Sequence, residues 1–312
     1  NLAEMRDSNK FRGVGVAVVT PFNSEGKVDY LALERLIDDI ICNHIDYLVL
    51  LGTTGETPNI SHDERQEIVR TAVRVNAKRV PIVVGFGGPS THLVVEQISN
   101  FDFTGVDAIL SVTPFYNRPT QQGLIEHFTT IAYHSPLPII LYSIKGRTGC
   151  NIDIETVLQL AENEKFIGIK EASGNMNQIM GLIKKTPEDF VVISGDDAIT
   201  LPLLAAGADG VISVVANAYP AEISEMVHLA MDNKFVEARQ YHLSMLDITQ
   251  ACFKEGNPAG IKTFLSVQGK IDYYLRLPLT RVSETHQAYI KRLATEMRTQ
   301  GIEHLRNLPK EQ

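Results

Sequence analysis

Lys170 is the residue whose position most directly suggests chemistry. It closes the run 166–170 (FIGIK), an otherwise apolar stretch with the length of a β-strand. A lysine at the end of a buried strand usually has a function, because desolvating an ammonium group is costly. Burial lowers the pKa of a lysine, and the neutral amine can attack a carbonyl to form a Schiff base. From this run alone, a strand-end lysine that simply reaches solvent is an equally good interpretation.

Composition limits the class of protein. The chain has 312 residues, of which 44% are hydrophobic and 21% are charged. This length fits one large α/β barrel or two smaller domains. The net charge is -8 and the basic residues are scattered, so we expect no nucleic-acid partner and no binding to an anionic membrane.

The sequence predicts a cytoplasmic protein. Cys42, Cys150 and Cys252 form no CxxC pair, which favours a reducing compartment. No apolar run reaches the roughly 18 residues of a membrane span. Residues 1–10 are polar and lack the apolar core of a signal peptide, and residues 1–4 precede the first methionine. We interpret those four residues as an expression remnant or the end of a truncated leader.

A strand-then-helix unit recurs along the chain. The strand-like runs are continuously apolar, as in parallel strands buried on both faces. They cover residues 14–19, 47–51, 81–85, 108–112, 138–142, 166–170, 191–194 and 210–213. Eight such units predict a (β/α)8 TIM barrel. An open doubly wound sheet would need a phosphate fingerprint, but residues 85–88 lack the GxGxxG spacing and residues 52–56 lack the lysine of a P-loop.

Helical patterns occupy the segments between the strands. Asp29 introduces one of them, and the S-x-x-E sequence from Ser61 to Glu64 is a capping box for another. The predicted helices cover residues 28–43, 61–75, 91–100, 121–134, 154–163, 177–186, 221–231, 235–252, 257–267 and 283–305. We therefore expect the barrel to span residues 11–232, with a C-terminal helical extension at residues 233–312 packed on it.

Polar side chains follow the predicted strands at the end where a barrel has its active site. They include Thr53, Thr54, Tyr142, Arg147 and Lys170. Tyr142 could merely pack its ring and Arg147 could be a surface charge. In a site, the tyrosine hydroxyl could move protons, and the planar guanidinium of Arg147 suits a carboxylate. Their convergence favours carbonyl chemistry by imine formation.

A metal centre is not predicted. Asp196 and Asp197 form a lone acidic pair with no histidine nearby, and the nine histidines are dispersed. We therefore expect neither a metal nor an organic cofactor.

Together these motifs make the chain strongly resemble the dihydrodipicolinate synthase / N-acetylneuraminate lyase family of class I aldolase-type barrels. The resemblance runs from about residue 11 to at least residue 281. Its carriers are residues 52–56 (GTTGE), 112–120 (VTPFYNRPT), 146–150 (GRTGC), 168–175 (GIKEASGN), 194–197 (SGDD), 210–214 (GVISV) and 257–258 (NP).

The resemblance implies catalytic roles, and the synthase branch fits best. Lys170 would form an imine with pyruvate, while Tyr142, Thr53 and Tyr116 would form a proton relay. Tyr116 is expected to reach across a subunit interface into a neighbouring site. The chain would then be a homo-oligomer, a tetramer built as a dimer of dimers.

The resemblance also implies the substrate-binding residues. Thr54 would hold the pyruvate carboxylate, and the Ile212 backbone and Gly195 would line the site. Arg147 would face the carboxylate of L-aspartate 4-semialdehyde. The implied reaction is a lyase-class condensation of pyruvate with that aldehyde to 4-hydroxy-tetrahydrodipicolinate, in lysine and diaminopimelate biosynthesis.

Two rival interpretations stay open. Another pyruvate aldolase of the family, such as a sialate or keto-deoxy sugar acid lyase, would usually have serine at Thr53 and would lack Arg147. A non-catalytic relative that senses keto acids would not need the proton relay.

Two departures from the family pattern stand out. Residues 143–145 read SIK where the family usually has asparagine, valine and proline, so we expect a less rigid loop. Pro89, Leu93 and Phe115 replace an asparagine, a glutamate and a tyrosine that commonly contact inhibitory lysine in relatives, while His62 keeps one polar position. We expect weak or absent inhibition by lysine, unless it binds through other groups such as Glu96.

Overall fold

The computed structural model describes residues 7–305 and contains a closed barrel of eight parallel strands. The strands follow one another around the barrel in sequence order, and β1 pairs with β8 to close it. They are β1 (Gly13–Ala17), β2 (Tyr47–Leu50), β3 (Ile82–Phe86), β4 (Ala108–Val112), β5 (Ile139–Ser143), β6 (Phe166–Glu171), β7 (Val191–Ser194) and β8 (Gly210–Ser213). The predicted barrel is confirmed, with strand ends that differ by at most two residues.

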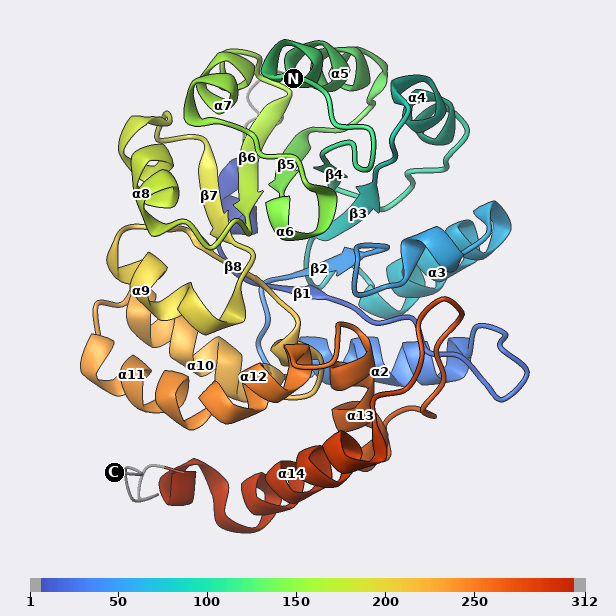
Figure 1. Ribbon diagram of the computed structural model, residues 1–312, viewed down its shortest axis with the longest axis vertical. Coiled ribbons are helices and arrows are strands. Elements are labelled where there is room, and N and C mark those ends of the chain that lie inside the picture. The colour runs from blue at the N-terminus through green and yellow to red at the C-terminus, as the bar shows by residue number, and fades with distance from the viewer. Residues whose placement is uncertain (1–6, 306–312) are drawn as a thin grey trace.

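Helices surround the strands on the outside (Figure 1). They are α2 (Tyr30–Cys42), α3 (His62–Asn76), α4 (Thr91–Ser99), α5 (Gln121–His134), α7 (Ile154–Ala161), α8 (Met176–Lys185), α9 (Thr200–Ala205) and α10 (Pro220–Met231). The capping box predicted at Ser61 is present. Our sequence analysis missed α9, whose six residues are too short to show a helical period.

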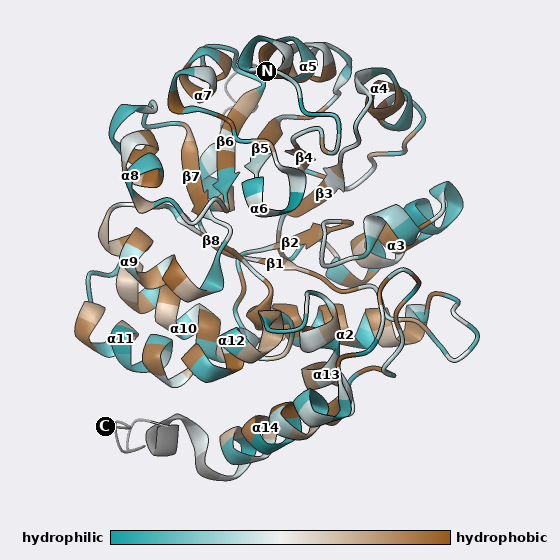
Figure 2. Ribbon diagram, viewed as in Figure 1, coloured by the Kyte–Doolittle hydropathy of each residue, from teal (hydrophilic) through white to brown (hydrophobic). Residues whose placement is uncertain are grey.

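Apolar side chains fill two layers, as expected for strands buried on both faces. One layer lies between the strands and the helices, and the other fills the barrel interior around Tyr47, Val49, Ile140 and Tyr142. Figure 2 shows the strands as largely hydrophobic, whereas β6 turns hydrophilic at its C-terminal end. That end holds Lys170 and Glu171, so β6 places its charged residues at the mouth of the barrel where the strands have their C-terminal ends.

The chain continues after α10 with four more helices, which gather along one side of the barrel (Figure 1). They are α11 (Phe235–Ser244), α12 (Leu246–Phe253), α13 (Ala259–Val267) and α14 (Glu284–Leu305). The single helix predicted at residues 235–252 was wrong, because a one-residue turn at Met245 breaks it into α11 and α12. The break buries the Met245 side chain and turns the apolar face of α12 inward.

None of the helices between residues 7 and 305 combines the length and the apolar character that crossing a membrane requires. The boundary at residue 232 between barrel and extension stays a prediction.

Candidate active site

Lys170 and Tyr142 lie side by side in the barrel interior. They are register partners on the adjacent strands β6 and β5. The register shifts one step earlier, because Ile139 pairs with Phe166 but Ile140 pairs with Gly168. This bulge leaves Ile167 as an extra residue, and an extra residue changes which face the following side chains occupy. Lys170 consequently shares the inward face with Tyr142.

The Lys170 side chain is enclosed by its neighbours. It is 6% exposed, and its Nζ lies 4.2 Å from the centroid of the Tyr142 ring. A Cβ atom at Gly195 would lie 3.1 Å from Lys170 Cε and 2.7 Å from Ala172 Cβ. Any larger residue at position 195 would therefore displace the lysine, so Gly195 shapes the space in which the amine sits.

The turn after β2 presents Thr53 and Thr54. Its geometry is set by backbone hydrogen bonds from Gly55 N to Gly52 O (3.1 Å) and from Glu56 N to Thr53 O (3.1 Å). Thr54 is buried, and its Oγ1 accepts a hydrogen bond from Asn257 Nδ2 at 2.9 Å. Because a hydroxyl has one proton to donate and Asn257 uses an acceptor position, Thr54 keeps its proton for a ligand.

A pocket of about 480 Å³ adjoins these residues. Thr53, Tyr142, Arg147 and Asn257 line it together, whereas Lys170, Thr54, Gly195 and Ile212 lie outside its lining among the described residues. Its other lining residues are predominantly apolar or small and include Leu51, Gly85, Phe86, Pro89, Leu93, Leu110, Val112, Phe115, Ile144, Pro278 and Leu279. The pocket can therefore admit a small substrate beside the barrel mouth.

Arg147 belongs to the short helix α6 (Lys145–Thr148), which follows β5 directly. Its side chain is exposed at the pocket, and its backbone N–H donates to Ile144 O at 3.0 Å. Thr148 Oγ1 donates to Ile144 O (3.1 Å) and accepts from Cys150 N (3.1 Å). The segment without proline is thus organised as a hydrogen-bonded helical turn, which our sequence analysis did not predict.

Tyr116 stands apart from the other predicted site residues. Its side chain is 93% exposed, and it lies outside the lining of the pocket in this chain. Its backbone has a φ of 70°, in the left-handed region that non-glycine residues rarely adopt. The proposed contribution of Tyr116 to a neighbouring subunit stays a prediction.

Asp197 holds the chain at the end of β8. Its carboxylate accepts hydrogen bonds from Ser213 Oγ (2.5 Å), Val214 N (2.9 Å) and Val215 N (3.3 Å). Burial raises its pKa, although these hydrogen bonds act in the opposite direction. Asp197 therefore fixes the backbone that follows Ile212, which is itself buried in β8.

The described residues form no cluster of three or more histidine, cysteine, aspartate or glutamate side chains suited to a metal ion. Our sequence analysis missed Asn257 as a site residue. It noticed the Asn257-Pro258 motif, but no local signal links that motif to Thr54, 203 positions earlier.

Comparison with known proteins places the chain in a family. Residues 10–297 match the model of the dihydrodipicolinate synthetase family. The 4-hydroxy-tetrahydrodipicolinate synthase of Azobacteroides pseudotrichonymphae is 48% identical over 290 residues, which cover 93% of this chain and 98% of that protein.

Solved structures agree with this match. The 4-hydroxy-tetrahydrodipicolinate synthase of Methylacidiphilum fumariolicum SolV is 40% identical, with a TM-score of 0.89 over 94% of this chain and 99% of its own. A structure described as the first monomeric dihydrodipicolinate synthase variant is 36% identical, with a TM-score of 0.90 over 93% and 97%. The chain therefore belongs to the dihydrodipicolinate synthetase family.

Proposed function

We propose that this chain condenses pyruvate with L-aspartate 4-semialdehyde through an imine on Lys170. The product is 4-hydroxy-tetrahydrodipicolinate, and the activity is that of a lyase in lysine biosynthesis, in line with the names of its relatives. The observation that carries the proposal is the enclosed amine of Lys170 against the Tyr142 ring, next to a pocket that holds Thr53 and Arg147.

The chemistry begins at the ketone of pyruvate. Lys170 Nζ attacks that carbon as the nucleophile, and loss of water gives an imine. The protonated imine draws electrons from the neighbouring methyl carbon, which loses a proton and becomes an enamine. That carbon then attacks the aldehyde of the second substrate, and the substrate amine displaces Lys170 to close the ring.

Proton transfer and orientation fall to the surrounding residues. We assign the relay to Tyr142, Thr53 and a Tyr116 contributed by a neighbouring subunit, since hydroxyls can both donate and accept protons. Thr54 has a free proton for the pyruvate carboxylate because Asn257 already occupies one of its acceptor positions. The Ile212 backbone and Gly195 complete the pyruvate site.

A direct comparison of substrates tests the function. Turnover of pyruvate with L-aspartate 4-semialdehyde is expected to exceed turnover of pyruvate with N-acetylmannosamine by orders of magnitude, because Arg147 offers a partner for the aldehyde's carboxylate. A coupled assay of ring product, run beside an assay for sialate, makes the measurement. Preferential use of N-acetylmannosamine would identify a sialate lyase, and turnover of neither would support a keto-acid sensor.

Arg147→Ala is expected to lower kcat/KM for L-aspartate 4-semialdehyde by roughly ten- to a hundredfold. The loss of one charged hydrogen-bond partner typically costs about 1.5–3 kcal/mol. Pyruvate imine formation, measured by borohydride trapping, should change little because Arg147 lies on α6 and outside the barrel interior.

Lys145→Ala is the matched control, since it removes an exposed cation from the same short helix but from outside the pocket lining in the described chain. It should retain use of both substrates. An equal loss for pyruvate and the aldehyde in Arg147→Ala would show that Arg147 acts on the fold instead.

We also propose a homo-oligomer, a tetramer arranged as a dimer of dimers. The support is the exposure of Tyr116 (93%), Leu277 (79%) and Leu93 (51%), of which Leu93 lies at the pocket. Exposed large apolar side chains are suited to burial against another copy. Sedimentation equilibrium measures the assembly state, and a fully active monomer would exclude a relay that depends on a partner's tyrosine.

A further inference from the structure

The segment after α12 reaches back to the turn that carries Thr53 and Thr54. Asn257 Nδ2 donates to Thr54 Oγ1 at 2.9 Å, and Lys262 Nζ contacts Glu56 Oε1 at 2.5 Å. The second carboxylate oxygen of Glu56 accepts from the backbone N–H of Arg276 at 3.1 Å. We call residues 257–276 the C-terminal segment. Three of its residues thus contact a turn that lies about 200 positions earlier in the chain.

The contact between Glu56 and Lys262 is an ion pair closed off from solvent. Both side chains are 0% exposed. Lys262 Nζ also donates to Tyr274 O at 3.0 Å and lies 4.3 Å from the centroid of the Phe22 ring. Burial lowers the pKa of Lys262 to about 8, although Glu56 acts to raise it. A buried pair of this kind is often no more stabilising than an apolar pair of similar size, so stability alone does not explain it.

Glu56 belongs to the same turn as Thr53 and Thr54, so a displacement of its backbone would also displace these two threonines. Its φ of 57° and ψ of 36° are left-handed, a conformation that a non-glycine residue keeps only when its surroundings impose it. Its backbone N–H donates to Thr53 O at 3.1 Å. The same turn is held by Thr20 Oγ1, which donates to Gly55 O at 2.7 Å. Fixing the Glu56 carboxylate therefore fixes the end of the turn that presents Thr53 and Thr54.

We propose that Lys262 is a positioning residue for pyruvate, acting through Glu56 on the turn that holds Thr54. The ion pair keeps Thr54 Oγ1 against Asn257, so that the hydroxyl proton stays directed at the pyruvate carboxylate. The C-terminal segment is then part of the pyruvate site. This inference rests on the proposed function, because it takes pyruvate to be the ligand of Thr54.

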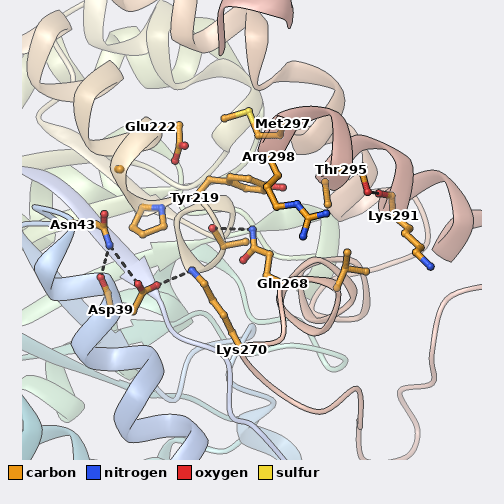
Figure 3. A pocket seen from close by; sticks show the side chains of 15 residues that line it. Asp39, Asn43, Tyr219, Glu222, Gln268, Lys270, Lys291, Thr295, Met297 and Arg298 are labelled. Carbon is orange, nitrogen blue, oxygen red and sulfur yellow. Dashed lines mark hydrogen bonds and ion pairs between the residues drawn. The ribbon is translucent and has the colours of Figure 1, made fainter. Parts of the chain in front are cut away.

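A second ion pair from the same segment provides a control. Lys270 Nζ contacts Asp39 Oδ2 on α2 at 2.6 Å, and Asn43 Nδ2 donates to Asp39 O at 2.7 Å (Figure 3). These residues line a separate pocket of about 590 Å³ whose described lining contains none of the predicted site residues. Loss of this ion pair should loosen the attachment of the segment to the barrel without changing the position of Thr54.

The test measures the pyruvate concentration that half-saturates borohydride trapping on Lys170, by mass spectrometry of the whole protein. Lys262→Met is expected to raise it roughly ten- to a hundredfold, since a displacement of about 1 Å in a binding group can cost that much. Trapping at saturating pyruvate should survive. Lys270→Met should leave the half-saturating concentration unchanged.

Lys262→Met leaves Glu56 buried without its partner and could prevent folding. The double variant Glu56→Gln/Lys262→Met removes both charges, and glutamine still accepts from Arg276 N–H. Circular dichroism checks its fold. If Lys262 positions the turn, the folded double variant keeps a raised half-saturating concentration, because the link between turn and segment stays broken.

Two outcomes overturn the inference. A folded double variant that binds pyruvate like the wild type would show that Lys262 only neutralises Glu56. An equal rise in Lys270→Met would show a general effect of loosening the segment. If the wild type traps no pyruvate, the proposed function fails, and the inference falls with it.

Discussion

Lys170→Ala is expected to abolish the borohydride-trapped pyruvate adduct and to lower turnover by several orders of magnitude. Without the amine no imine forms, and the condensation loses its covalent intermediate. The change should leave the barrel intact, because alanine removes a side chain that ends at the barrel mouth. Mass spectrometry of the peptide that carries residue 170 measures the adduct, and circular dichroism checks the fold.

Lys165→Ala is a suitable control for labelling. Lys165 directly precedes β6 at its opposite end, where its Nζ donates to Ser135 O at 2.8 Å. This variant should be labelled at Lys170 as the wild type is. Adduct on another lysine, or persistent labelling of Lys170→Ala, would contradict the assignment.

Lysine is expected to inhibit this enzyme weakly or not at all, with no half-inhibition in the sub-millimolar range. Pro89, Leu93 and Phe115 line the pocket beside Thr53 and Arg147. The family resemblance implies that polar residues for lysine binding commonly occupy these three positions. Losing two charge-assisted contacts at about 1.5–3 kcal/mol each weakens binding roughly a hundred- to ten-thousandfold. Glu56 is the one acid in the described lining, and it is already paired with Lys262.

Titration of lysine against the initial rate checks this expectation. Leu93→Glu offers the converse experiment, because a carboxylate there could pair with the ammonium group of lysine and should strengthen inhibition. Sub-millimolar inhibition of the unmodified enzyme would mean that other groups, such as Glu96, bind the ligand.

The fold and the family could be predicted because their signals are local. Continuous apolar runs mark the strands, and the motifs around Thr53 and Lys170 lie within short segments. Both predictions are confirmed by the closed barrel and by the match over residues 10–297. The orientation of the Lys170 side chain was harder to predict from the sequence. It depends on the bulge between β5 and β6, and no residue type in these strands indicates a bulge.

Contacts between distant segments could not be predicted from one sequence. Asn257 and Lys262 look like ordinary residues of a helical extension, yet they contact Thr54 and Glu56. Their partners become visible only when the extension is placed on the barrel. Tyr116 poses a related problem, because its expected partner belongs to another subunit and its own chain leaves it exposed.

The separation of Glu56 and Lys262 in the chain has a consequence for synthesis. They are 206 positions apart, so at roughly 5–20 residues per second a ribosome needs on the order of 10–40 s to travel between them. During that interval the six strands β3 to β8 are synthesised, but the Glu56 carboxylate lacks the Lys262 ammonium group with which it pairs in the interior, so we expect it to stay hydrated. We therefore expect the turn after β2 to be among the last parts of the barrel to take its final form, after the strands themselves have been synthesised.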